Sequence, residues 1–202
     1  MKKILAWDLP TRLGHWLLAS GFILSFFSGD SEELRLVHIG AGSAVAGILV
    51  FRLFWGIAGT RYARFNSFLF SPSQVWAYLT GLLKGKPEHW IGHNPAGSYA
   101  IFALLLLAVS VVGSGCAEYL GIGGDPMEEA HDMLSYSMLG MVCIHLTGVV
   151  AGSYLHRENL VLGMVTGYKH GSPEDAISPK SNYWVVLLLL LTASASLMVF
   201  AS

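Results

Sequence analysis

The segment from Ala130 to Gly152, AHDMLSYSMLGMVCIHLTGVVAG, is apolar enough and long enough to cross a membrane as a helix. It contains two histidines, His131 and His145, which are 14 residues apart. At 100° per residue their rings lie within about 40° of each other on one helix face, and at 1.5 Å per residue they are about 21 Å apart along the axis. Ionisable side chains are rare and costly in membrane spans, so the pair predicts a functional site near each membrane surface.

The rest of the chain has the composition of an integral membrane protein. Hydrophobic residues make up 53% of it and charged residues only 12%. Four further apolar runs, at about residues 13–29, 36–58, 96–115 and 183–201, each approach the roughly 20 residues that a spanning helix needs. The sequence therefore predicts an all-α membrane protein with five spans. The net charge of −1 argues against nucleic-acid binding, which needs a concentrated basic surface.

Basic residues are distributed very unevenly around these spans. Only Arg35 would lie on the side of the membrane reached after the first span. The other eleven predict a cytoplasmic N-terminus and an external C-terminus, since cytoplasmic connections carry the excess of Lys and Arg. These eleven are Lys2, Lys3, Arg12, Arg52, Arg61, Arg64, Lys84, Lys86, Arg157, Lys169 and Lys180. The predicted external face is acidic, with Asp30, Glu32, Glu33, Glu118, Asp125, Glu128, Glu129 and Asp132.

Two connections carry clear local signals. Ser71 followed by Pro72 predicts the start of a short amphipathic helix over residues 73–83, lying in the membrane interface. Asn94 is expected to cap the third span and Pro95 to open it. Residues 169–182 contain Gly, Ser, Pro and charges, which predicts a cytoplasmic linker before the last helix, residues 183–202.

Two more histidines complete the pattern. His15 lies near the cytoplasmic end of the first span, at the level predicted for His145. His38 lies near the external end of the second span, at the level predicted for His131. Two level-matched pairs are what two bis-histidine haems in a helix bundle require. No C-x-x-C-H attachment signature is present, so any haem is expected to bind without a covalent link.

Other polar residues near the spans have weaker assignments. Arg12 lies on the same side of its helix as His15, and Arg52 interrupts an apolar span; both could bind propionates of the inner haem. Arg12 is equally compatible with a simple positive-inside anchor. The remaining histidines, His89, His93, His156 and His170, are expected to be interfacial or solvated, although His156 could also serve as a spare ligand or a quinone-site donor.

The same residues carry a resemblance to a known family. The run from Trp7 to Trp16, WDLPTRLGHW, the segments Val37–Gly40 and His93–Gly97, and His131 with His145 resemble bacterial cytochrome b561 and the b-type cytochrome of nickel-iron hydrogenases. The resemblance covers about residues 5–168. It implies that residues 1–168 form one domain, a four-helix core that holds two haems in the bacterial inner membrane. It implies His15 with His145 on the inner haem and His38 with His131 on the outer one. The fifth span departs from the four-helix pattern.

The resemblance implies electron transfer between the quinone pool and a redox partner. We expect this partner to be a periplasmic protein such as a c-type cytochrome or a hydrogenase. One alternative is an oxidoreductase that exchanges electrons between quinone and a small species such as superoxide. Another is a haem-free transporter or scaffold in which the histidines relay protons or pack. Proton relays usually bring intramembrane Asp or Glu, and Asp132, near one edge, is the nearest such residue here.

Overall fold

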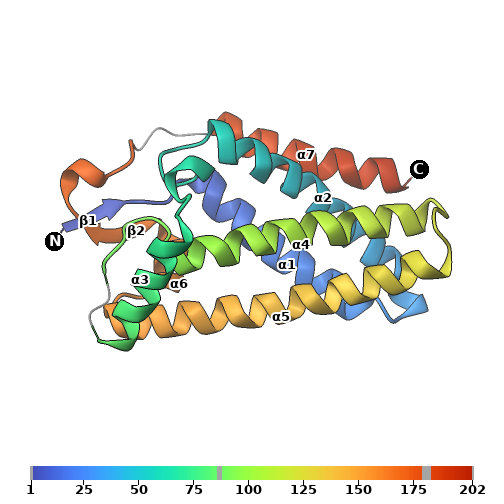
Figure 1. Cartoon of the computed structure of the whole chain (residues 1–202). Coiled ribbons are helices and arrows are strands. Elements are labelled where there is room, and N and C mark those ends of the chain that lie inside the picture. Colours follow the sequence, from blue (N-terminus) through green and yellow to red (C-terminus); the bar gives the residue numbers. More distant parts are fainter. Residues whose placement is uncertain (1, 86–87, 179–182, 202) are drawn as a thin grey trace. The chain divides into compact units, whose positions relative to one another are not determined.

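The computed structural model describes residues 2–85, 88–178 and 183–201. Within these residues the chain is mainly helical (Figure 1). The helices are α1 (Leu9–Ser28), α2 (Arg35–Ala58), α3 (Pro72–Leu83), α4 (Pro95–Tyr119), α5 (Asp125–His156), α6 (Leu160–Thr166) and α7 (Tyr183–Ala201). The strands are β1 (Lys2–Leu5) and β2 (Tyr168–Gly171), and short 3-10 turns occur at Glu32–Leu34, Phe65–Ser67 and Pro173–Asp175.

The predicted apolar runs coincide with α1, α2, α4, α5 and α7. Among the described residues, three helical segments are long and apolar enough to cross a membrane: Glu32–Ala58, Pro95–Tyr119 and Asp125–His156. Helix α1 has 20 residues but carries Arg12, His15 and Trp16 in its first half, which lowers its hydropathy. In α7 the described apolar part, Val185–Ser194, is shorter than a full span. The prediction of an all-α membrane protein is therefore confirmed, and the number of spans stays a prediction.

The predicted helix starts are confirmed by their capping hydrogen bonds. The Ser71 side chain accepts from the Gln74 backbone N–H while the Gln74 side chain accepts from the Ser71 N–H, which is a capping box in front of α3. The Asn94 side chain accepts from the Gly97 N–H at 2.7 Å, and Pro95 is the first residue of α4. These bonds are local, so sequence spacing was enough to predict them.

The residues fall into two compact units. Unit 1 comprises residues 1–12, 54–103 and 141–181, and unit 2 comprises residues 13–53, 104–140 and 182–202. In unit 1, β1 and β2 pair antiparallel with Lys2 opposite Gly171 and Leu5 opposite Tyr168 (Figure 1). A hydrophobic core cluster of this unit contains Ala6, Trp7, Tyr62 and Ile177.

The β1–β2 sheet was not predicted. Residues 169–182 were expected to be a linker, whereas the described part contains β2, a 3-10 turn and Ile177, whose N–H donates to the Leu5 carbonyl at 2.9 Å. Gly167 joins α6 to β2 with φ of +87°, a conformation that glycine adopts without steric cost. Each strand has only four residues and its partner lies at the other end of the chain, so no hairpin signal was available to reveal the pair.

Candidate functional site

Unit 2 brings two of the four predicted ligands together. His38 comes from the first turn of α2 and His131 from the second turn of α5, and their ring centroids are 6.1 Å apart. Two imidazoles bound to one metal at about 2.0 Å per bond, each with its ring centre about 1.1 Å beyond the nitrogen, would have centroids about 6 Å apart. The ring planes make an angle of 85°. The observed separation therefore suits one iron between the rings.

Hydrogen bonds fix which ring nitrogen each histidine offers. His38 Nδ1 lies 2.8 Å from the Ser25 carbonyl oxygen on α1. His131 Nδ1 lies 3.1 Å from the Val111 carbonyl and 3.0 Å from Ser114 Oγ on α4. A carbonyl oxygen only accepts, so Nδ1 carries the hydrogen in both rings and Nε2 keeps its lone pair. Metal-bound histidines are oriented by this kind of second hydrogen bond. The residues present therefore fit a bis-histidine haem.

Close packing around His131 depends on Gly115 in α4. A Cβ built on Gly115 would lie 2.9 Å from His131 Cε1 and 3.3 Å from its Nδ1, closer than side chains pack. Sequence reasoning did not identify Gly115, Ser25, Val111 or Ser114 as part of this site. Ser and Gly are common in membrane helices for other reasons, and each of these residues meets its histidine from another helix.

The second predicted pair is divided between the units. His15 lies in unit 2 on α1, and its ring packs edge-on to Trp16 at 5.0 Å. His145 lies in unit 1, on the same continuous helix α5 as His131. The pairing of His15 with His145 stays a prediction, and so does their binding of an inner haem.

The two arginines occupy different settings. Arg12 belongs to unit 1, where Nη1 donates to the Val165 carbonyl at 2.5 Å. Its Nε is buried and has no hydrogen-bond partner among the residues that the structure describes. Arg52 belongs to unit 2 and is half buried within α2. Binding of haem propionates by either residue stays a prediction, and the buried Nε of Arg12 is compatible with it.

A buried carboxylate next to Arg12 was missed. Asp8 is 6% exposed and accepts three hydrogen bonds: from the Thr11 N–H at 2.7 Å, Trp55 Nε1 at 3.1 Å and Thr60 Oγ1 at 2.6 Å. The hydrogen bond from the Thr11 N–H makes Asp8 the N-cap of α1. The hydrogen bonds from Trp55 and Thr60 connect this N-cap to the C-terminal end of α2. An Asp directly before a Leu-Pro helix start was a usable local signal, but its two distant donors were not visible in the sequence.

The other histidines lie in unit 1. His93 packs between Trp7 and Phe68, with ring centroids at 4.7 and 4.4 Å. His156 Nε2 lies 3.1 Å from the Tyr78 hydroxyl. His89 and His170 approach the carboxylate of Glu158. Sequence reasoning treated them as interfacial or solvated and did not foresee these partners.

Comparison with known proteins identifies the family of this chain. The family model described as prokaryotic cytochrome b561 matches residues 6–167. Three proteins described as probable Ni/Fe-hydrogenase B-type cytochrome subunits are similar to this chain. The relative from Rhizobium leguminosarum bv. viciae is 22% identical, and the match covers 82% of this chain and 88% of the relative. The relative from Cupriavidus necator is 23% identical, with coverage of 84% and 88%, respectively. The hydrogenase 1 subunit from Escherichia coli K12 is 27% identical, with coverage of 80% and 88%. No solved structure matches the chain. With most of its length matched, the chain belongs to the prokaryotic cytochrome b561 family.

Proposed function

We propose that this protein is a membrane b-type cytochrome that transfers electrons between the quinone pool and a periplasmic redox partner through two bis-histidine haems. The observation that carries the proposal is the His38–His131 pair, whose rings are 6.1 Å apart and whose Nδ1 atoms both point at backbone carbonyls. A haem bound there would supply reversible one-electron transfer. Two axial ligands would leave no open position for oxygen chemistry at the metal.

The chain's own residues do the positioning. The carbonyls of Ser25 and Val111 hold the two rings in the tautomer that presents Nε2 to a metal. His15 and His145 would hold the inner haem, and Arg12 and Arg52 would bind its propionates. Charge-assisted hydrogen bonds from a guanidinium orient such carboxylates and favour their ionised form. Both haems would be type b, since they bind without thioether links.

A hydrogenase is the partner class that the relatives favour, because all three are described as subunits of Ni/Fe-hydrogenases. A c-type cytochrome would use the same external surface. The direction in which electrons flow depends on the potentials of the partner and the quinone.

The direct test measures both cofactor and substrate. Purified protein in detergent should contain two haems per chain by pyridine haemochrome assay, and a short-chain quinol should reduce both. A ratio of one or zero haems would contradict the two-site assignment. Two haems that no quinol reduces would contradict the proposed substrate.

Contacts within unit 1 support the proposed four-helix topology of α1, α2, α4 and α5. The β1–β2 pair holds the N-terminus beside the connection that follows α5. The hydrogen bond between the Tyr78 hydroxyl and His156 Nε2 holds α3, in the connection between α2 and α4, beside the end of α5. These contacts favour a topology in which all three segments lie on one side of a membrane. The segments include nine of the eleven basic residues assigned to the cytoplasm, which supports a cytoplasmic location for that side; the other two, Arg12 and Arg52, lie within α1 and α2.

This topology predicts the outcome of reporter fusions. Fusions after Lys84 and Lys169 should report a cytoplasmic location, because both follow segments on the basic side. A fusion after Ser202, which lies outside the described residues, should report the external side if α7 crosses the membrane. Alkaline phosphatase and fluorescent protein fusions measure the two locations. A cytoplasmic signal after Ser202 would remove the fifth span and leave the four-helix core intact.

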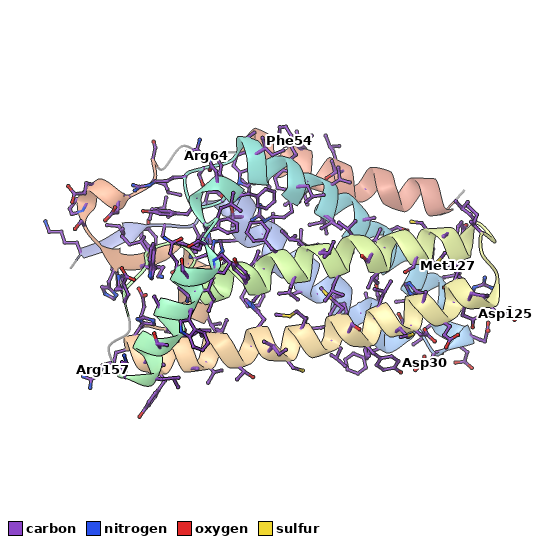
Figure 2. All side chains as sticks on the ribbon, in the orientation of Figure 1. Asp30, Phe54, Arg64, Asp125, Met127 and Arg157 are labelled. Carbon is purple, nitrogen blue, oxygen red and sulfur yellow. The ribbon has the colours of Figure 1, made fainter. Side chains whose placement is uncertain are left out.

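The external surface is expected to dock its partner by charge. All eight acidic residues predicted there lie in unit 2 and are exposed, together with Arg35. Asp30 and Asp125 lie at the same end of this unit (Figure 2). A field of one sign accelerates encounter with an oppositely charged protein and is screened beyond about 8–10 Å at physiological salt.

We therefore expect oxidation of the reduced protein by a basic c-type cytochrome to slow steeply as salt is raised. Stopped-flow absorbance measures the rate. Changing Glu128 and Glu129 to Gln should flatten the salt dependence, whereas changing Glu174, an acidic residue of unit 1, to Gln should leave it unchanged. A rate that neither salt nor the paired substitution alters would contradict electrostatic docking.

A further inference from the structure

The second half of α5 carries a long surface groove in unit 1. Its apolar part is lined by Leu146, Thr147, Val150, Ala151 and Tyr154, with a volume of about 580 Å³. Val150 and Tyr154 also line the adjoining hollow, of about 460 Å³, which continues past Ser153 to Arg157 and Glu158. The two hollows adjoin at Val150 and Tyr154 and form one shallow, open groove, whose apolar end begins at Leu146.

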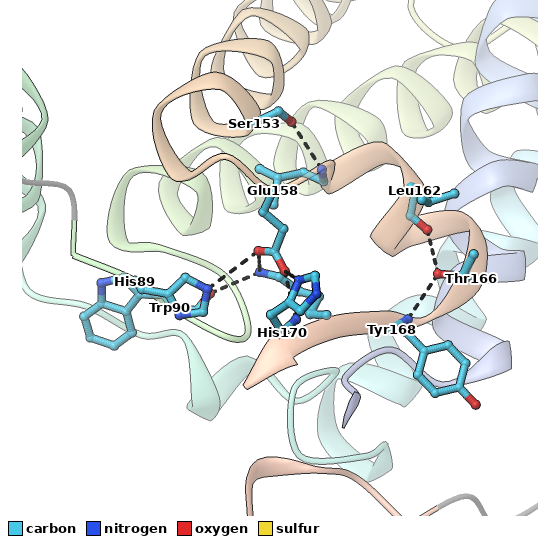
Figure 3. Close-up of polar contacts among 10 residues, drawn as sticks. His89, Trp90, Ser153, Glu158, Leu162, Thr166, Tyr168 and His170 are labelled. Carbon is cyan, nitrogen blue, oxygen red and sulfur yellow. Dashed lines mark hydrogen bonds and ion pairs between the residues drawn. The ribbon is translucent and has the colours of Figure 1, made fainter. Parts of the chain in front are cut away.

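The polar end of the groove is Glu158, which lies at the centre of a charged cluster (Figure 3). Its side chain is only 10% exposed. Lys169 Nζ lies 3.4 Å from Glu158 Oε2 and donates to the Trp90 carbonyl at 3.1 Å. The backbone N–H of His170 donates to Glu158 Oε1 at 3.0 Å. Burial raises the pKa of Glu158, but the bond from His170 and the charge of Lys169 outweigh it and hold the pKa below its ordinary value. The carboxylate is therefore ionised at neutral pH and can accept a proton.

Two imidazoles connect this carboxylate to water. His89 Nε2 lies 3.7 Å from Glu158 Oε2, and that side chain is 31% exposed. His170 Nδ1 lies 3.8 Å from Glu158 Oε1, and that side chain is 54% exposed. Imidazole exchanges protons near neutral pH, and both rings lie within ion-pair distance of the carboxylate. The His89 ring also lies 6.2 Å from that of His156, which is hydrogen-bonded to Tyr78.

The occupant of this groove should be apolar along most of its length and neutral at its head. A phospholipid would bring its phosphate to the Glu158 carboxylate, and Arg157 at the rim could offset only part of that repulsion. An isoprenoid quinone has an apolar tail and a neutral ring that takes up and releases protons when it changes oxidation state. Unlike the phospholipid, the quinone has a use for a buried carboxylate beside two partly exposed histidines.

We propose that this groove binds the ring and proximal tail of an isoprenoid quinone and that Glu158 is the group that exchanges protons with it. The inference rests on the proposed function, which supplies the one-electron acceptor. In quinol oxidation both O–H bonds break. A haem held by the proposed ligands would accept the two electrons one at a time, while the two protons pass in turn to Glu158 and out through His170 or His89. The product is the quinone, and the reverse sequence reduces it.

Photolabelling tests the location of the site. The full chain in nanodiscs is irradiated with an azido-quinone, and the labelled peptide is identified by mass spectrometry. We expect label within residues 146–161. Val150→Trp should lower labelling by about tenfold or more, a loss of at least about 1.4 kcal/mol in binding. Leu162→Trp, an exposed apolar position on α6 outside the groove lining, should leave it within about twofold. Label elsewhere, or competition by phospholipid and not by unlabelled quinone, would overturn the proposal.

A second set of variants tests the proton-exchange role. Glu158→Gln should retain the photolabel and the haem spectrum, while reduction of haem by quinol slows by about a hundredfold, within the usual contribution of a general base. Added imidazole should restore part of the rate, which a merely structural role for Glu158 would not allow. If Glu158→Gln fails to fold, the exposed pair His89→Gln and His170→Gln should slow the same step and show the same rescue. An unchanged rate and pH profile would overturn the role of Glu158.

The results separate this inference from the proposed function. Wild-type protein that quinol reduces, with label confined to another surface, contradicts the groove and leaves the proposed function standing. Wild-type protein that carries haem but neither reacts with quinol nor binds the azido-quinone contradicts both.

Discussion

Replacing His131 with Ala should remove one haem and leave about one per chain, the largest effect expected of any single substitution. His131 would supply one of the two ligands of the outer haem, and its hydrogen-bond partners, the Ser114 hydroxyl and the Val111 carbonyl, are poor replacements for an imidazole. His38→Ala should have the same effect. His145→Ala should instead remove the inner haem. Pyridine haemochrome content and redox-resolved spectra distinguish the two losses.

Two control variants sharpen this result. Ser114→Ala deletes one of the partners of His131 Nδ1 but leaves the Val111 carbonyl, so the protein should keep both haems and shift only the affinity or potential of the outer one. His170→Ala changes an exposed histidine of unit 1 and should leave haem content unchanged. If His131→Ala and His145→Ala both keep full and unshifted spectra, the ligand assignment is wrong.

Asp8→Ala should lower the free energy of unfolding by about 3 kcal/mol. The substitution removes the cap of α1, typically worth about 1 kcal/mol. It also removes the acceptor of the buried Trp55 indole N–H and of the half-buried Thr60 hydroxyl, at about 1–3 kcal/mol for a buried group left unsatisfied. Asp8→Asn keeps an oxygen that can accept from the Thr11 N–H and should therefore lose less. Denaturation in mixed micelles, followed by tryptophan fluorescence, measures both variants.

The matched control is another acidic residue of unit 1. The Asp175 carboxylate lies 3.7 Å from the Arg61 guanidinium. The Arg61 side chain is 57% exposed and the Asp175 side chain 29%. Solvent-exposed pairs of this kind contribute about 0–1 kcal/mol, so Asp175→Asn should have a small effect. An Asp8→Ala variant as stable as Asp175→Asn would show that the three hydrogen bonds to Asp8 do not hold the start of α1.

Local features made the helical elements predictable. Apolar runs of membrane-spanning length are visible residue by residue, and the capping signals at Ser71–Pro72 and Asn94–Pro95 involve neighbours three residues apart or fewer. The meeting of His38 and His131 was also expected, because helix rise fixes the level of each residue once the spans are known. Their binding of haem stays a prediction.

Tertiary structure alone decided how these elements are held and what surrounds the histidines. The pairing of β1 with β2, the three donors to Asp8 and the Glu158–Lys169 cluster each join residues that are far apart in sequence. The carbonyls that orient His38 and His131 are invisible in a sequence, since every residue has one and only the packing of α1 and α4 selects Ser25 and Val111. Sequence by itself thus determined the class of protein and the four candidate ligands, because hydropathy and helix periodicity act locally. The hydrogen bonds that orient these histidines depend on which helices pack together, and no local sequence pattern encodes that packing.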